Sequence, residues 1–529
     1  MTQWARAPQQ RDQMVLFAER LDEAVPPEHA VRLLEEILAR IDWTKWEAAY
    51  HVRLGQPAIH PRVLSGVLLY GLMTRIRSSR SLEEALVVRL DYRWLAEGRT
   101  IDHTTLSEFR RRHPGELKEL FVQICRIARE LGLLSLARLA FDGTRVRSSN
   151  RRSGTRTPQE LREEQAECEA RFAEYAAAAE AEDARDEEVF GLQAPHVLPA
   201  ELADARRRQR KIQAALAELN RLEAAGQTPP ARLPLTDPQS RVMPNKEGGF
   251  APNYTPTATV DVASGLIVEA TVLGVVNEDQ HLIPAIAAVQ EQFGLEQPPA
   301  EVLVDGLIGT GANLAAAEER GITVYSPCAI PDPATNPALR ADPQQPVPAE
   351  QWDRLPTKKV TVAGRVSMQL DKRAFVYDAE RDSYWCPRAQ ELPYANTTRE
   401  ASGTGERIRR RYQAAPAACA ACPLRARCLQ GKAQARLINR EQYEPHRERH
   451  AQRMATPQAQ ETYTQRRHAG EQPFATIKHH FGLRRFLLRG LEGVQAEWHW
   501  AAITFNLLRL MSLLRSRAGP IFTPLLHPP

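Results

Sequence analysis

Two short apolar runs, each ending at a single aspartate, constrain the fold of this chain more than any other feature. Residues 136–141 lead into Asp142, and residues 301–304 lead into Asp305. Apolar runs of this length, bounded by polar residues, predict buried β-strands. Each aspartate is therefore expected at the end of a strand.

The elements predicted between and after these runs follow a definite order. They are strands at 257–262 and 266–273, a helix at 282–293, the strand before Asp305, a helix at 313–320 and a strand at 323–325. This order predicts an α+β fold with an RNase H-like mixed sheet, in which the first strand lies beside the later one. Asp142 and Asp305 are then expected together, at adjacent strand ends.

Residues 26–135, within an N-terminal domain expected at 1–135, show the apolar periodicity of short helices. Ser81 to Glu84 and Thr105 to Glu108 match the capping-box pattern that opens a helix, and Pro114 is expected to start another. A basic run, Arg110, Arg111 and Arg112, lies on one of these helices. The region is predicted either as a helix-turn-helix-like DNA-binding domain or as an ordinary helical bundle.

Two stretches are expected to leave the core. Residues 155–235 are rich in Ala, Glu and Arg and predict a helical-hairpin insertion that serves as a spacer or dimerisation arm. Residues 331–462 begin Pro-rich and contain four cysteines, which are Cys386, Cys419, Cys422 and Cys428. Their spacing fits either the four ligands of a structural zinc or four reduced structural cysteines.

Charge and cysteine content indicate which binding partners and which cellular compartment to expect. The net charge of +5 is modest, so local arginine clusters matter more than the total as a sign of an anionic partner. Seven cysteines, an odd number, argue against a disulfide framework. No apolar run is long enough for a membrane helix, and the first residues lack a signal-peptide pattern, so we expect a cytoplasmic protein near the nucleoid.

A third acidic residue, Glu471, lies on a predicted helix close to several cations. Arg467, Glu471, Phe474 and Lys478 are spaced by four, three and four residues and are expected on one helix face. A helix face that carries an acid between two cations is suited to contact with a phosphate backbone. The alternative is that Glu471 only pairs with Arg467 on a solvated helix.

The residues from Tyr463 to Asn506 resemble the C-terminal signature of the DDE transposases of bacterial insertion sequences, in the IS4-like superfamily and closest to the IS1182 type. The resemblance rests on Glu-x-Pro-Phe-x-x-Ile-Lys at 471–478, on residues 482–486 with 489–490, and on the helix at 501–510. Asp142 and Asp305 stand where the family keeps its two aspartates. Two departures are that Arg466 and Arg467 compete for the motif's arginine, and that Leu307 and Ile308 replace the usual residues after Asp305.

The resemblance implies a DNA transposase that cuts the ends of its insertion sequence and joins them to target DNA. Two Mg²⁺ or Mn²⁺ ions would be held by Asp142, Asp305 and Glu471, because hard cations prefer carboxylates. Lys478 and either Arg466 or Arg467 would bind backbone phosphates, and Arg110, Arg111 and Arg112 would bind DNA. The implied partners are double-stranded DNA, with the terminal inverted repeats and the target, and a second copy in a homodimer assembled on DNA. The cysteine pattern of the IS1182 type also implies that the four cysteines act as one unit.

Shifts in composition, together with the predicted strands and helices, divide the chain into six parts. These are a DNA-binding domain at 1–135, the first core strand at 136–154, the helical insertion at 155–235, the core continued at 236–330, the second insertion with a zinc-ribbon-like site at 331–462, and the catalytic and closing helices at 463–529. Two other functions remain open, a catalytically silent or domesticated DNA-binding protein and a metal-dependent nuclease on the same fold. Trp498 and Trp500 are candidates for stacking on a flipped base or for core packing.

Overall fold

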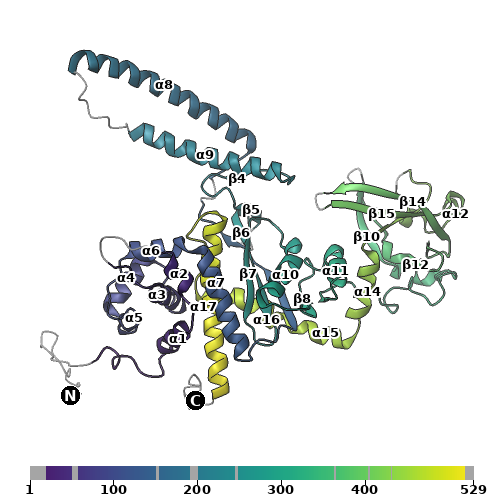
Figure 1. Cartoon of the computed structure of the whole chain (residues 1–529). Coiled ribbons are helices and arrows are strands. Elements are labelled where there is room, and N and C mark those ends of the chain that lie inside the picture. The colour runs from purple at the N-terminus through teal and green to yellow at the C-terminus, as the bar shows by residue number, and fades with distance from the viewer. Residues whose placement is uncertain are drawn as a thin grey trace, which may run out of the picture.

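A computed structural model gives the fold of the chain (Figure 1). It describes residues 20–50, 57–150, 154–190, 200–244, 248–362, 365–402, 405–430 and 432–518. Helices and a mixed sheet make it an α+β protein, as the sequence predicts. Within the described residues, no helix is both long enough and apolar enough to cross a membrane.

The N-terminal region is helical throughout its described part. Its helices are α1 (Ala30–Ala39), α2 (Thr44–Ala48), α3 (Pro61–Met73), α4 (Ser79–Val88), α5 (Leu90–Leu95), α6 (His103–Arg112) and α7 (Pro114–Glu130). Both predicted capping boxes are wrong. Asp102 caps α6 by accepting from the backbone N–H groups of Thr104 and Thr105, and α4 begins before Ser81. An aspartate at the N-cap can accept hydrogen bonds from the first free N–H groups of a helix, so the glutamate of a capping box is not needed.

The central sheet is mixed and contains both aspartate strands. Its strands are β1 (Arg138–Gly143), β2 (Val146–Arg147), β5 (Arg241–Pro244), β6 (Phe250–Asp261), β7 (Ile267–Leu273), β8 (Glu301–Leu303) and β9 (Thr323–Tyr325). β1 pairs antiparallel with β6 and parallel with β8, and β8 pairs parallel with β9. The turn between β6 and β7 uses Gly265 at φ +73°, a backbone angle that favours glycine.

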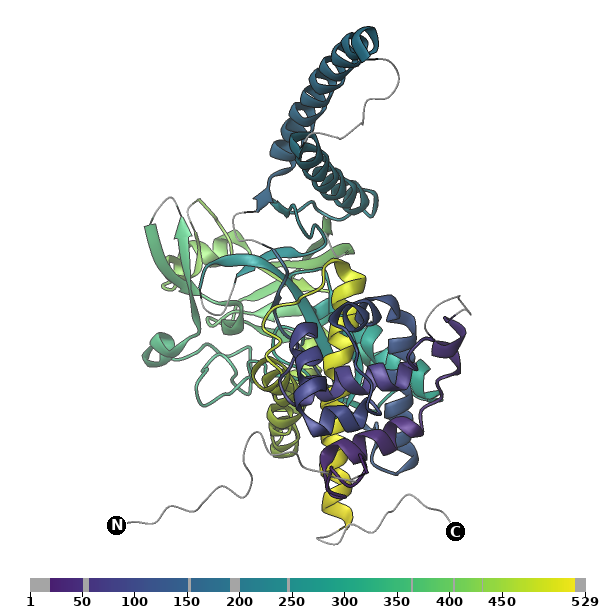
Figure 2. The ribbon, with the colours of Figure 1, turned by 90° about the vertical axis from the view of Figure 1, so that its left-hand side faces the viewer.

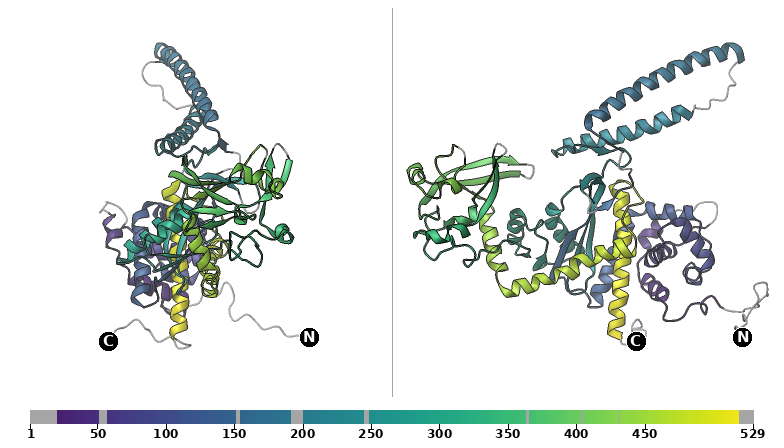
Figure 3. Two further views of the ribbon diagram at one scale, coloured as in Figure 1. Left: turned by 90° about the vertical axis from the view of Figure 1, so that its right-hand side faces the viewer. Right: turned by 180° about the vertical axis from the view of Figure 1, so that it is seen from behind.

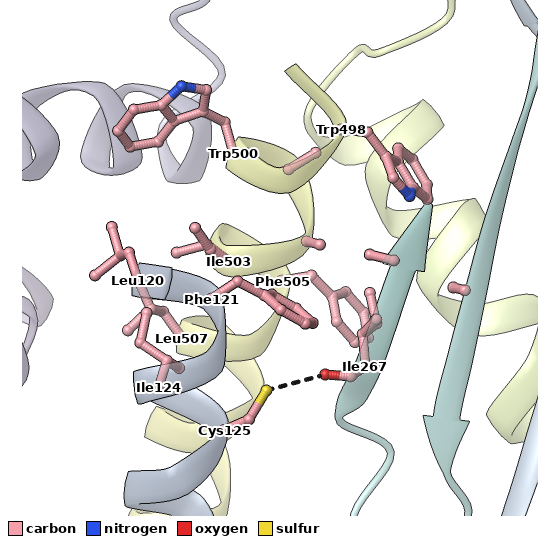
Figure 4. Packing of buried hydrophobic residues seen from close by; sticks show 14 of the residues in the cluster. Leu120, Phe121, Ile124, Cys125, Ile267, Trp498, Trp500, Ile503, Phe505 and Leu507 are labelled. Carbon is pink, nitrogen blue, oxygen red and sulfur yellow. Dashed lines mark hydrogen bonds between the residues drawn. The ribbon is translucent and has the colours of Figure 1, made fainter. Parts of the chain in front are cut away.

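Helices cover the sheet and connect it to the N-terminal region. They are η1 (Asp279–His281), α10 (Leu282–Phe293), α11 (Gly311–Glu318), α16 (Arg466–Ala475), the wide turn η4 (Thr476–His480) and α17 (Gly490–Ala518). α17 stands between the N-terminal helices and the sheet and packs against α7, α3 and β7 (Figures 1 and 2). Figure 4 shows this packing, with Phe121 of α7 and Phe505 of α17 in the buried cluster beside Ile267 of β7. One continuous apolar core therefore runs from the N-terminal helices through α17 to the sheet.

An arm of two helices leaves the core after β2. α8 (Pro158–Phe190) and α9 (Ala200–Ala224) pack against each other and project from the body of the protein (Figures 1 and 3). The short strands β3 (Thr155–Arg156) and β4 (Leu233–Pro234) pair at its base. Leu161, Ile212 and Leu219 are fully buried in a small apolar cluster of their own. This cluster is separate from the main core, which fits an inserted element.

The second insertion forms its own sheet, which lies on the opposite side of the core from the N-terminal helices (Figure 3). Its elements are η2 (Ala349–Arg354), β10 (Thr357–Val362), β11 (Arg365–Leu370), η3 (Lys372–Ala374), β12 (Val376–Asp378), β13 (Ser383–Trp385), β14 (Glu391–Ser402), β15 (Gly405–Gln413), α12 (Pro416–Ala420), α13 (Arg425–Cys428) and β16 (Leu437–Glu441). The next helices, α14 (Glu444–Met454) and α15 (Pro457–Thr464), already pack against α11 and β9. The chain thus returns to the core before Tyr463.

Candidate active site

Asp142 occupies the end of β1, where the strand leaves the core. Leu139, Ala140 and Phe141 before it are fully buried, and the Asp142 side chain is only 13 % exposed. Its Oδ1 accepts from the N–H of Gly143 at 2.9 Å, and its Oδ2 accepts from Arg466 at 2.9 Å. A buried carboxylate is thus held in a fixed orientation by the strand end and by one cation.

Asp305 follows β8 and begins a tight turn. Its Oδ1 accepts from the N–H groups of Leu307 and Ile308 at 2.8 and 2.9 Å, the pattern of an aspartate that organises its own loop. Because β8 lies parallel beside β1, both strands end at the same edge of the sheet. The structure therefore brings Asp142 and Asp305 to one place, as their predicted strand positions require.

Burial dominates the electrostatics of Asp142. It raises the pKa of the carboxyl from 3.8 to about 6, against the opposing effects of Arg466 and the Gly143 N–H, and the nearby acids Asp305 and Glu278 raise it further. A raised pKa at a strand end crowded with acids marks a place where additional positive charge would be favourable.

Glu471 reaches this edge from α16. Its side chain is 60 % exposed, and its Oε1 lies 3.8 Å from Arg466, whose other terminal nitrogen holds Asp142. Arg467 is exposed. The helix contains Pro473 and ends at Ala475, where the wide turn η4 replaces regular helix geometry. Among the two competing arginines, Arg466 is the one that links the carboxylates.

Two more polar side chains complete the surroundings. Lys478, on η4, donates a hydrogen bond to Thr144 Oγ1, just past Asp142. Burial raises the pKa of the Tyr463 phenol, Arg466 lowers it, and Asp305 and Asp142 raise it. The phenol therefore lies near the acidic edge of the sheet. Both residues belong to the segment that includes Glu471.

Glu278 is an acid at this edge that the sequence interpretation did not single out. It stands just before η1, and its carboxylate packs against Gly143. The only sequence signal is an acidic pair, Glu278 and Asp279, between a predicted strand and a predicted helix. Over the residues described, no three His, Cys, Asp or Glu side chains are close enough together to hold a metal ion.

The arginines predicted to bind DNA lie in different surroundings. Arg110 is half-buried and donates to the backbone oxygen of Arg77 at 3.0 Å, and burial lowers its pKa. Arg77 in turn bonds Gly482, Arg485 and Glu497. Arg110 is thus part of the contact between the N-terminal helices and the C-terminal segment. Arg111 and Arg112 are exposed, and Arg112 pairs with Glu108.

The four cysteines of the second insertion come together at the edge of its apolar cluster. Cys386 lies between β13 and β14, and its sulfur accepts from the N–H groups of Arg388 and Gln390 at 3.3 Å. Burial raises the pKa of Cys428 to about 12, opposed by Arg436, and the other three thiols add to the increase. The four side chains are therefore near enough to influence one another.

Trp498 and Trp500 are core residues. Trp498 is fully buried, donates to the oxygen of Thr257 at 3.0 Å and stacks on Phe474, while Trp500 is 3 % exposed. Figure 4 shows both on α17. Buried indoles of this kind fix the position of α16 against α17, and stacking on a base would require them to leave the core.

Comparison with known families gives two matches. Residues 385–511 match a family described as a transposase DDE domain, and residues 19–112 match one described as a transposase domain (DUF772). The first match contains Glu471, Arg466 and the four cysteines, whereas Asp142 and Asp305 lie outside both matches. No curated protein matches the chain.

Proposed function

We propose that this chain, which carries two transposase domains typical of IS1182-family transposases, is a DDE transposase that cleaves the ends of its own insertion sequence and joins them to target DNA. The observation that carries the proposal is the meeting of Asp142, Asp305 and Arg466 at one sheet edge with Glu471 close by.

The proposed catalytic core is RNase H-like. Its support is the strand order β7, β6, β1, β8 and β9, with the first three antiparallel and the last three parallel. In this arrangement the first strand occupies the centre of the sheet. Its end is the place where residues from several elements can converge on one substrate.

The residues at this edge have the donor chemistry of the divalent-metal site that the family implies, although among the described residues no three of these acids stand close enough to share an ion. Asp142 is buried, its pKa is raised, and it lies among other acids with one arginine as its cationic partner. Oxygen ligands suit Mg²⁺ and Mn²⁺. Asp142, Asp305 and Glu471 would hold two such ions, which when bound activate the attacking oxygen and stabilise the leaving one.

The surrounding side chains supply positioning. Arg466 holds Asp142 and lies near Glu471, so it orders the two carboxylates that come from different elements. Lys478 stands beside Thr144 at the same edge and is placed to bind a backbone phosphate. These contacts would orient the DNA without reading its sequence.

The remaining parts of the proposal concern DNA and assembly. The N-terminal helices are proposed to bind DNA through the exposed Arg111 and Arg112, with terminal inverted repeats and target DNA as partners and a homodimer forming on DNA. The division of the chain into six parts belongs to the same proposal. So does a structural zinc, for which the four clustered cysteines would have to draw closer together.

A strand-transfer assay tests the function. Purified protein, Mg²⁺ and a labelled duplex that carries the inverted repeats flanking the gene should give both cut ends and ends joined to a second DNA. Asp142→Asn, Asp305→Asn and Glu471→Gln should each abolish both products while DNA binding remains, because metal ligation needs the charge and the amide keeps the shape.

The two competing functions give different results in this assay. Cut ends without joined ends would identify a nuclease. DNA binding without either product would identify a silent relative. A carboxylate variant that keeps cleavage within about tenfold of the wild type would remove that residue from the site.

A further inference from the structure

One face of α9, on the arm that projects from the body of the protein, is strongly basic (Figure 1). Its four cations are exposed and lie in two pairs one helical turn apart, Arg206 with Arg210 and Arg207 with Lys211. The other side of the helix is buried against α8, with Ile212 fully inaccessible to solvent. We call these four residues the basic face of α9.

The charge of the basic face is largely uncompensated. From residue 205 to residue 220, α9 contains one acid, Glu218, and that side chain is buried at the base of the arm. Arg207 pairs with Asp204, but in the part of the chain that the structure describes, the other three cations form no ion pair. Like charges one turn apart on a helix repel each other, so a bound polyanion would stabilise this face.

A buried ion pair at the base holds the arm in a fixed direction. Glu218 of α9 accepts from Arg241 of β5 at 2.7 Å, and their side chains are only 5 % and 9 % exposed. Arg221 of α9 also donates to Glu218, through two nitrogens at 2.8 and 2.9 Å. Swinging the arm would break a buried pair, which is strongly unfavourable. Because β5 belongs to the central sheet, the basic face keeps a fixed place relative to that sheet.

The base of the arm lies beyond the end of β1 that carries the first aspartate. Asp142 pairs with Ala258 of β6, whereas Arg241 pairs with Asn253 of the same strand. Five residues of a strand span about 17 Å. Arg147 of β2 also pairs with Asn253, so the chain itself runs from the aspartate towards the arm in this direction. A duplex held at Asp142 that follows this direction meets the arm.

Exposed arginines lie between the aspartate edge and the arm. Arg145 donates to the backbone oxygen of Pro244, the last residue of β5, at 2.8 Å. Arg485 and Arg489 donate to backbone oxygens of residues 149–150 at 3.4 and 3.2 Å. In the described ranges, none of these three guanidinium groups pairs with an acid, so their charge is available to an anion. Their positions connect the two regions with positive charge.

We propose that the arm is a DNA-binding element, in which the basic face of α9 holds the phosphate backbone of the duplex that extends from the aspartate edge. The inference rests on the proposed transposase function. It gives the arm a role other than the spacer or dimerisation arm expected from its sequence. The contacts are to phosphates and therefore do not depend on base sequence.

Duplex DNA fits this face better than a second copy of the chain. A second copy would use the exposed acids of α8, such as Glu163 and Glu167. Stable protein interfaces, however, bury an apolar centre, and none of the exposed large apolar side chains of the described residues lies on α8 or α9. A phosphate backbone needs only cations along its path, which this face supplies.

Two matched double variants of the full chain test the proposal. Arg206→Gln with Arg210→Gln removes two charges from the basic face, and Arg162→Gln with Arg171→Gln removes two from exposed positions of α8 on the same arm. Fluorescence anisotropy measures binding to a labelled duplex that carries one inverted repeat flanking the gene. The α9 variant should weaken binding by about fivefold or more and lower the log–log salt slope by about 1.8, because each lost phosphate contact contributes about 0.9. The α8 variant should change the affinity by less than about twofold.

Three results would overturn the proposal. Equal effects of the two double variants would mean that only the total charge of the arm matters. An α9 variant that binds as tightly as the wild type would remove the basic face from the DNA contact. Light scattering without DNA tests the remaining alternative, since a wild-type dimer that the α9 variant loses would assign the face to a second copy.

Hydroxyl-radical footprinting locates the contact and separates it from the function on which it rests. The wild type should protect the cut end and a second stretch of the same duplex, and the α9 variant should lose only the second stretch. An α9 variant that protects both rejects the arm's role but leaves the proposed transposase intact. A wild type that binds the duplex yet yields neither cut nor joined ends in Mg²⁺ rejects the transposase function, whereas the loss of the second stretch in the α9 variant would still support the arm. A wild type that binds no duplex at low salt would overturn both.

Discussion

Arg466 reaches across from α16 to Asp142 at the end of β1, and the two side chains form a 2.9 Å ion pair in which each is only 13 % exposed. The pair joins residues 324 positions apart in the sequence. It also holds the helix of Glu471 against the sheet, because the second terminal nitrogen of Arg466 lies near the Glu471 carboxylate. The proposed catalytic arrangement therefore depends on a cation as well as on acids.

Removing that cation should destabilise the metal-free protein. Arg466→Gln leaves the largely buried Asp142 without its partner and should lower the free energy of unfolding by up to roughly 3–5 kcal/mol, the range for broken buried pairs. Urea unfolding in EDTA measures the decrease. Arg467→Gln is the matched control at the neighbouring exposed arginine, and its effect should stay within about 0.5 kcal/mol. Equal decreases would show that Arg466 is not the linking residue.

The raised pKa of Asp142 predicts a pH dependence with a definite sign. An acid with a folded pKa near 6 and an ordinary value of 3.8 binds its proton more tightly when folded, so metal-free stability falls as pH rises between these values. Asp142→Asn should remove this fall, so the stability of the metal-free variant should change little between about pH 4 and pH 6. Divalent-cation binding to wild type should weaken below about pH 6, where Asp142 becomes protonated. Unfolding curves with flat, equal pH profiles for both proteins would contradict the assignment.

The exposed arginines of α6 should control DNA affinity in the full chain. Arg111→Gln with Arg112→Gln should weaken binding to any duplex and reduce the log–log salt slope by about 0.9 for each phosphate that the protein no longer neutralises. Arg126→Gln on α7 is an exposed control and should leave the slope unchanged. Fluorescence anisotropy at several salt concentrations measures both quantities, and an unchanged slope in the double variant would favour a helical bundle without a DNA-binding role.

The cysteine cluster should hold one zinc that stabilises the second insertion. Cys422→Ser should remove the metal and lower the stability of that insertion, because a four-thiolate shell contributes folding energy. Cys328→Ser is the control, since Cys328 is exposed and outside the cluster. Elemental analysis of purified protein should give one zinc in wild type and in the control. A wild type without zinc, prepared without chelator, would refute the site.

Local sequence patterns predicted helices and strands well where an apolar run and the turn residues beside it indicated the same boundary. The helix expected at 282–293 is α10 to the residue, and the strands before Asp142 and Asp305 are β1 and β8. Such elements depend on residues close in sequence. The capping boxes failed because the pattern allows several start points, and Asp102 offered a better acceptor than Thr105.

Long-range features could not be predicted in this way. Glu278 lies against Gly143 only because the turn after β7 folds back to the end of β1, where Asn313 Nδ2 donates a hydrogen bond to the oxygen of Asp279. The choice between Arg466 and Arg467 depends on how α16 is set against β1. Trp498 and Trp500 show the same limit, since their burial depends on contacts with β6 and with the N-terminal helices.

The position of α17 has a consequence for synthesis of the chain. Its apolar residues complete the core of α7 and α3, which are translated long before it. On the ribosome, those first helices keep an uncovered apolar face, shown by Leu120, Phe121 and Ile124 in Figure 4, until α17 emerges. A nascent chain interrupted anywhere before residue 490 therefore lacks a finished N-terminal region, so premature termination would release a target for chaperones and proteases instead of a competing DNA binder.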